Sequence, residues 1–189
     1  MSRPCLLINR DLLAYHTRLE WRDPRAVELV VVHATELPDL AEARRYGGRI
    51  VHEATRTGNS GHYYIDRDGA IHQYVEDQRV AHHVKGHNQR SIGIELVNLG
   101  RYPDWLDSRR QEPSDPFPPA QIDALAALIA ELARRLPGLK LVAGHADLDR
   151  TLVEASDDPS LKVRRKIDPG PQFPWPELLA RISLERTLD

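Results

Sequence analysis

The feature that most constrains the fold is an almost continuous apolar run from Glu28 to His33, in which three valines follow one another. β-Branched residues favour strands, and a strand that lacks alternating polar residues is buried on both faces. Such a strand lies inside a sheet that other elements cover from both sides. The run therefore predicts the central strand of an α/β protein.

Other segments carry strand patterns as well. Residues 62–75 read as a hairpin whose turn contains Gly69, a residue that can supply the positive φ required there. Residues 92–97 and 141–143 are apolar runs of strand length. These strands predict further members of the same sheet.

Helices are expected between and after the strands. Apolar residues at three- and four-residue spacing predict a helix over about 120–136, and shorter helices are expected within 41–55 and over 176–184. Residues 101–119 contain five prolines and must form a loop. We therefore predict a single-domain α/β fold, a central mixed β-sheet flanked by α-helices, with a core from about residue 26 to residue 185.

Length and charge exclude several classes of protein. The chain has 189 residues, a formal net charge of -2 and no basic stripe, which argues against nucleic acid as a partner. No run approaches the roughly 20 apolar residues of a membrane span. Cys5 is the only cysteine, so no internal disulfide forms. The length suits one domain, and we expect a monomer.

The start of the chain bears on its location. Residues 5–8 are apolar, but the stretch is shorter than the roughly 7–15 residues at the centre of a signal peptide. We therefore expect a cytoplasmic protein. The alternative is a periplasmic or secreted protein from which a signal peptide has been removed.

Three residues far apart in the chain form a candidate metal site. His33 ends the valine run, His145 ends a second apolar run, and Asp168 lies beside two cations in the segment 165–171. Two imidazoles and one carboxylate leave a fourth zinc position open, which is typical of a hydrolytic rather than a structural site. Taken singly, each histidine also suits a hydrogen-bonded core position, and Asp168 before Pro-Gly also suits a turn.

Several blocks together give a more specific indication. The sequence contains VVHAT at 31–35, SGHYYIDRDG at 60–69, AHH at 81–83, NQRSIGIEL at 88–96, GH at 144–145 and RKIDPGP at 165–171. In this order they resemble the zinc-dependent N-acetylmuramoyl-L-alanine amidases of the AmpD type. That family shares its fold with phage amidase lysozymes and peptidoglycan recognition proteins.

The resemblance implies roles for individual residues. His33, His145 and Asp168 are expected to bind Zn2+. Glu95 matches the catalytic glutamate, which would take a proton from the attacking water and pass it to the leaving amine. Phage relatives use a tyrosine at the position of Gly61, so the proton transfer here would depend on Glu95.

Further expected roles concern the oxyanion and the substrate. Lys166 resembles the lysine that stabilises the oxyanion. Residues 147–163 contain an insertion relative to the family, which makes Lys162 a competitor for that role. His83 and Asn88 are expected to contact substrate in the cleft, and His82 is expected to point away from it. We expect the 101–119 loop and the insertion to rim that cleft.

The implied function is hydrolysis of the amide between N-acetylmuramic acid, in its 1,6-anhydro form, and L-alanine of muropeptides during peptidoglycan recycling. Three different functions stay open beside it. The chain could be an exported amidase that degrades intact cell wall, a non-catalytic muropeptide-binding module, or a metal hydrolase of this fold acting on another amide. Loss of a zinc ligand would favour the binding module, and the sequence retains all three ligands.

Overall fold

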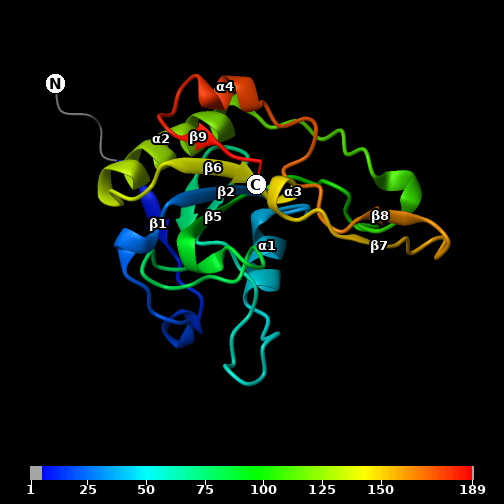
Figure 1. The fold of residues 1–189 in the computed structure, drawn as a ribbon, viewed down its shortest axis with the longest axis horizontal. Helices are drawn as coiled ribbons and strands as arrows, with labels where there is room; N and C mark the ends of the chain where they lie inside the picture. Colours follow the sequence, from blue (N-terminus) through cyan, green and yellow to red (C-terminus); the bar gives the residue numbers. More distant parts are fainter. Residues whose placement is uncertain (1–5, 189) are drawn as a thin grey trace.

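A seven-stranded sheet forms the centre of the molecule in the computed structural model, which describes residues 6–188 (Figure 1). Cys5 lies outside the described residues. The strand order is β1-β4-β3-β5-β2-β6-β9. In chain order these are β1 (Ile8–Arg10), β2 (Leu29–Ala34), β3 (Tyr63–Ile65), β4 (Ile71–Gln73), β5 (Ser91–Leu96), β6 (Leu141–Gly144) and β9 (Glu185–Arg186). A separate hairpin pairs β7 (Leu152–Glu154) with β8 (Lys162–Arg164).

The sheet is mixed, as predicted. Strand β2 lies between β5 and β6 and is parallel to both, and β3 is parallel to β5. Strand β4 returns antiparallel to β3 through the predicted turn, where Gly69 adopts a φ of 90°. All six residues of β2 are buried, which confirms the central position expected from the valine run.

Helices cover both faces of the sheet. Helix α2 (Pro119–Arg135) packs on one face, where Leu125 and Leu128 share a core cluster with Val30 and Ile94. Helix α1 (Leu40–Gly47) lies on the other side, where Ala43 belongs to a second cluster (Figure 1). The remaining helices are α3 (His145–Leu148), α4 (Trp175–Leu179) and the short 3-10 helices His16–Arg18, Pro24–Ala26, Asn88–Arg90 and Ser108–Arg110. Among residues 6–188, no helix is long and apolar enough to cross a membrane.

The C-terminal helix was predicted to be longer than it is. The expected helix over 176–184 ends at Leu179, and the chain then pairs with the edge of the sheet as β9. The backbone N–H of Glu185 donates to the carbonyl of Lys140. The helix ends early because the backbone after it pairs with the open edge of β6. A longer helix would leave the hydrogen-bonding groups of that edge without these partners.

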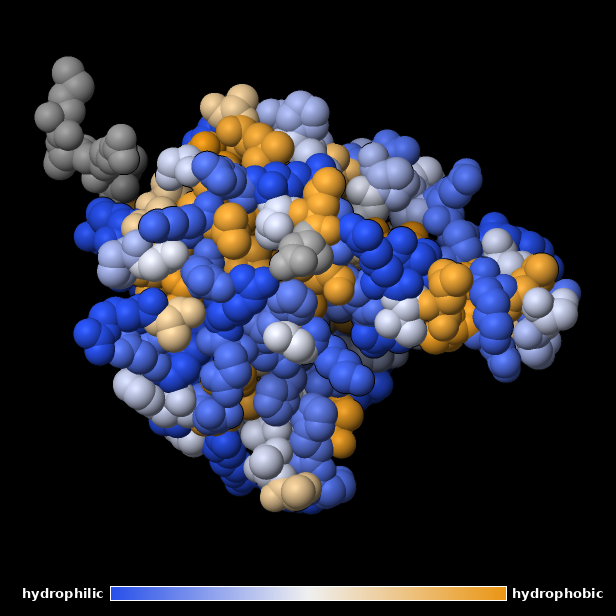
Figure 2. Space-filling view, viewed as in Figure 1, coloured by the Kyte–Doolittle hydropathy of each residue, from blue (hydrophilic) through white to orange (hydrophobic). Residues whose placement is uncertain are grey.

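The insertion forms an arm that extends from the body of the protein. Residues 152–164 fold into the β7–β8 hairpin, which lies beside the 101–119 loop at the right of Figure 1. Leu152 and Leu161 of this arm are exposed, and apolar and polar residues alternate over its surface in Figure 2. Apart from one short 3-10 helix, the 101–119 loop is irregular up to Pro119, as its prolines predict.

A buried ion pair ties the loop to the segment that follows the arm. The Arg101 guanidinium donates to both oxygens of Glu36, at 2.7 and 2.9 Å. It also donates to the carbonyls of Arg164 and Arg165, at 3.0 and 3.3 Å. Both side chains of the pair are almost fully buried. This contact fixes the chain just before Lys166.

Removing Arg101 should destabilise the fold. Arg101→Ala leaves the Glu36 carboxylate buried without its cation, which should lower the free energy of unfolding by about 3–5 kcal/mol. Urea unfolding followed by circular dichroism measures the change. Arg110→Ala removes an exposed pair with Asp104 and should have a much smaller effect. Equal stabilities of R101A and wild type would contradict the role given to this pair.

Candidate active site

The parallel strands bring the candidate metal ligands to one edge of the sheet. His33 is the penultimate residue of β2, and His145 directly follows β6 at the start of α3. The two strands run parallel in register, with Val32 opposite Gly144. Carboxyl ends of parallel strands meet at the same edge, where α/β proteins form their sites. The two imidazoles consequently lie edge to face, with ring centroids 4.7 Å apart.

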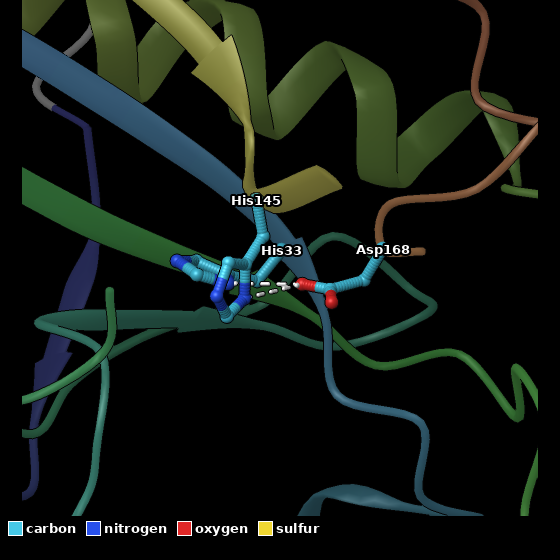
Figure 3. A group of neighbouring side chains, drawn as sticks. All are labelled: His33, His145 and Asp168. Carbon is cyan, nitrogen blue, oxygen red and sulfur yellow. Dashed lines mark hydrogen bonds and ion pairs between the residues drawn. The ribbon is translucent and has the colours of Figure 1, made fainter. Parts of the chain in front are cut away.

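Asp168 completes a three-residue cluster (Figure 3). Its Oδ2 atom lies 3.0 Å from Nδ1 of His33 and 3.2 Å from Nδ1 of His145. One potential ligand atom from each residue lies within 4.8 Å of the others, and all three side chains are buried. The structure therefore brings the three predicted ligands together.

The cluster has the properties of a site for a divalent cation. Both ring nitrogens of His145 and Oδ1 of Asp168 are buried without a hydrogen-bond partner among the described residues. Buried polar atoms rarely stay without a partner, and such atoms call for an explanation. Tetrahedral ligands about 2.0 Å from zinc are about 3.3 Å apart, close to the separations found here. Two imidazoles and a carboxylate are also a donor set that suits zinc.

Glu95 lies beside this cluster. Strand β5 pairs in register with β2, which puts Glu95 opposite His33. Burial, the largest cause, raises the pKa of Glu95 above its ordinary value, and the Asp168 carboxylate adds to the rise. A Cβ atom at Gly61 would lie 2.8 Å from Cγ of Glu95, so the glycine leaves room for this side chain. A carboxyl group with a raised pKa suits proton transfer near neutrality.

The cluster opens into a cavity of about 940 Å3. Glu95 and Lys166 line it together with the three candidate ligands. Lys162 is on the exposed arm instead, where its Nζ pairs with Glu154 at 3.1 Å. Of the two lysines, Lys166 is the one that lines the cavity.

The cavity walls differ from the expected ones. Thr151 is the only cavity-lining residue of the 147–163 insertion, and the 101–119 loop supplies none among those identified. A wall comes instead from the end of α1, with Tyr46 and Gly47, and from the segment between α1 and β3, with Arg49, Val51, His52, Asn59 and Ser60. His82, expected to point away from the cleft, also lines the cavity and packs edge-on against His52 at 4.7 Å. No sequence pattern marked this wall, because irregular chain carries no periodicity.

His83 and Asn88 line the cavity too, and both ring nitrogens of His83 and Oδ1 of Asn88 have partners inside the protein. Nδ1 of His83 lies 3.0 Å from Nε2 of His33, and its Nε2 lies 3.2 Å from the Ser91 hydroxyl. Oδ1 of Asn88 accepts hydrogen bonds from the backbone N–H groups of His83 and Val84. Burial lowers the pKa of His83 well below its ordinary value. Both side chains thus hold the site together, and a substrate group that bonds to the His83 ring nitrogens or to Asn88 Oδ1 would compete with these bonds.

Known proteins with similar sequences are amidases and phage endolysins. The chain is 34% identical over 137 residues to the 1,6-anhydro-N-acetylmuramyl-L-alanine amidase AmpD of Escherichia coli, covering 68% of this chain and 61% of that protein. It is 36% identical over 84 residues to the endolysin of Klebsiella phage KP32, covering 44% of this chain and 51% of the endolysin. The matched stretches thus span only about half to three fifths of these relatives.

Solved structures share the fold. The amidase LysC from Clostridium intestinale superposes with a TM-score of 0.64 at 20% identity, covering 94% of this chain and 98% of that one. The Escherichia coli amidase AmiD, solved with the substrate anhydro-N-acetylmuramic acid-L-Ala-D-gamma-Glu-L-Lys, gives a TM-score of 0.61 at 28% identity. That match covers 82% of this chain and 57% of AmiD.

The family model described as N-acetylmuramoyl-L-alanine amidase matches residues 23–171, which include His33, Glu95, His145 and Asp168. The match covers most of the chain and every residue of the buried cluster. The chain therefore belongs to the N-acetylmuramoyl-L-alanine amidase family.

Proposed function

We propose that this protein is a zinc-dependent amidase that hydrolyses the bond between N-acetylmuramic acid and L-alanine in muropeptides. The observation that carries the proposal is the convergence of His33, His145 and Asp168 at the base of a cavity that Glu95 and Lys166 also line. Bound zinc supplies a Lewis acid that polarises the scissile carbonyl and acidifies water. Membership of the amidase family supports the assignment.

The chain's own residues provide proton transfer and charge stabilisation. Glu95 accepts a proton from the attacking water at its carboxylate and later gives it to the leaving amine of alanine. Burial raises the pKa of Glu95 above its ordinary value, which makes the carboxylate a stronger base toward the attacking water. The Lys166 ammonium donates a hydrogen bond to the oxyanion that develops on the carbonyl.

The substrate we propose is a small anhydro-muropeptide of the recycling route, encountered in the cytoplasm by a monomeric enzyme. A cavity of about 940 Å3 falls within the size range of small-molecule sites. The relative AmpD carries the anhydro substrate in its name, and AmiD was solved with such a compound. The endolysin relative favours a second candidate, an amidase acting on intact cell wall.

A binding module without activity and a hydrolase of a different amide receive less support. A non-catalytic module would not need a complete set of three metal ligands. It would also not need the buried polar atoms of His145 and Asp168 that have no hydrogen-bond partner among the described residues. Hydrolysis of a different amide would use the same residues, and product analysis separates it from muropeptide cleavage. Mass spectrometry of the products from purified muropeptides tests for both functions.

The site should hold one zinc ion per chain. Wild-type protein should contain one equivalent of zinc by elemental mass spectrometry, and removal with a chelator should abolish amidase activity until zinc is restored. His145→Ala should lose the metal, because only two of three ligands remain. His72→Ala, in strand β4 outside the cavity lining, is the matched control and should retain it. Unchanged zinc content in H145A would contradict the proposed ligand set.

Glu95 and Lys166 should be needed for turnover but not for metal binding. Glu95→Gln should lower kcat by about two to four orders of magnitude, because the amide cannot take up a proton. Lys166→Ala should lower kcat by about two to three orders through loss of an oxyanion donor. Steady-state kinetics on a muropeptide measures both changes.

Lys162→Ala is the matched control for the lysine, since Lys162 pairs with Glu154 on the exposed arm. It should retain wild-type turnover. Near wild-type activity of zinc-loaded E95Q would remove Glu95 from the mechanism, and a larger loss in K162A than in K166A would reverse the roles of the two lysines.

The enzyme should prefer soluble fragments to assembled wall. At equal concentration of cleavable bonds, anhydro-muropeptides should be hydrolysed faster than intact sacculi, because the cavity is of small-molecule size. Release of peptides, followed by chromatography, gives both rates. A clear preference for sacculi would refute the recycling role and leave the amidase chemistry intact.

A further inference from the structure

A line of hydrogen bonds starts at the metal ligand His33 and runs away from the cavity. Nε2 of His33 lies 3.0 Å from Nδ1 of His83. Nε2 of His83 lies 3.2 Å from the hydroxyl oxygen of Ser91, and that hydroxyl lies 2.8 Å from the carbonyl oxygen of His87. The far end of this line is a backbone carbonyl, which can only accept.

The accepting carbonyl sets the direction of every bond in the line. The Ser91 hydroxyl donates its one hydrogen to the His87 carbonyl, so it accepts from Nε2–H of His83. A neutral imidazole with its hydrogen on Nε2 has a bare Nδ1, which accepts from Nε2–H of His33. Nδ1 of His33 is then bare, and it is the nitrogen that faces Asp168 Oδ2 at 3.0 Å.

The ring of His83 is held in this orientation from several sides. Asn88 Oδ1 accepts from the backbone N–H of His83, which fixes the turn that carries the ring. The buried Arg22 guanidinium donates to the carbonyls of Asn88 and Ser91, at 2.8 and 2.6 Å. A Cβ atom at Gly93 would lie 2.6 Å from Cγ of His83, so only glycine allows the ring to lie this close to β5.

The second histidine ligand has no equivalent partner. Nε2 of His145 lies 4.0 Å from Asp149 Oδ2, too far for a hydrogen bond, and neither of its ring nitrogens has a hydrogen-bond partner among the described residues. Histidine ligands usually donate their other ring N–H to a nearby acceptor, which fixes the tautomer and strengthens the ligand. In this site, His33 receives that support from a second imidazole.

We propose that His83 is a positioning residue, which accepts the Nε2 hydrogen of His33 and thereby presents Nδ1 of His33 to the metal. The inference rests on the zinc site proposed above. It gives His83 a role inside the protein in place of the predicted polar contact with substrate. It also assigns Ser91 and Gly93 to the support of the site, although neither touches a ligand directly.

The tautomer of His83 provides a direct test. In zinc-loaded, 15N-labelled protein, two-bond 1H–15N correlation spectra should show His83 neutral, with Nε2 protonated and Nδ1 accepting, and His33 protonated at Nε2. His83→Asn assigns the signals by difference. A His83 ring protonated at Nδ1, or at both nitrogens, would overturn the proposal, because it could not accept from His33.

Zinc affinity gives a second test with a conservative rescue. Competition with a chromogenic chelator should show zinc binding about 10- to 100-fold weaker in His83→Ala than in wild type. His83→Asn should recover most of the affinity, since its side-chain oxygen can take the place of Nδ1 as acceptor. His82→Ala changes the neighbouring cavity histidine, which packs against His52 instead, and should bind zinc as wild type does.

Thermal melting of the zinc-loaded variants checks that each is folded. Equal zinc affinities of folded H83A and wild type would overturn this inference alone and leave the amidase assignment standing. Absence of zinc from the wild-type protein would overturn the proposed function and this inference with it. If H83A and H83N both bind zinc more weakly than wild type while their melting is unchanged, an acceptor at this position is not sufficient and the shape of the imidazole matters instead. That result would also overturn the role proposed for His83.

Discussion

The parallel pairing of β2 with β5 and β6 is the constraint on which the rest of the structure depends. Every residue of β2 is buried, with Val30 and Val32 packed under α2 and Val31 on the opposite face. A shift by one residue would turn each side chain to the wrong face, so the register is strongly specified. That register puts His33 opposite Glu95 and next to the end of β6. The packing of valines thus sets the geometry of the chemical groups.

Without a bound ion, the burial of these polar groups lowers the stability of the folded state. A buried polar atom without a hydrogen-bond partner costs about 1–3 kcal/mol, and His145 and Asp168 present three such atoms. A divalent cation bound there would give each of these residues a partner. A cation that binds only the folded chain, and not the unfolded one, stabilises the folded state by mass action. Metal binding and folding are therefore coupled in the proposed enzyme, and the exceptionally apolar strand beneath the site helps to offset the cost.

The parts of the fold that follow from local pattern could be predicted from the sequence. The valine run, the hairpin around Gly69 and the helix over 120–136 each have a periodicity or a turn residue that the structure bears out. Blocks of family resemblance identified the residues of the buried cluster. Strand β9 could not be foreseen, because its pairing depends on an edge that only the assembled sheet presents. Most of the cavity wall, from Arg49 to Ser60, and the inward position of His82 arise from irregular chain, which carries no pattern.

In the proposed enzyme, chemistry and substrate choice are carried by different parts of the molecule. The histidine ligands and Glu95 lie on or directly after strands that the core holds in register, whereas the cavity walls come largely from loops. Loops can change in length and sequence without moving strand ends, so one catalytic site can serve different substrates. The match to both an anhydro-muropeptide amidase and a phage endolysin fits this division. Asp168 and Lys166 are the exception, since they lie in the loop that follows β8, and the buried pair of Arg101 and Glu36 supplies the rigidity that a strand gives the histidines and Glu95.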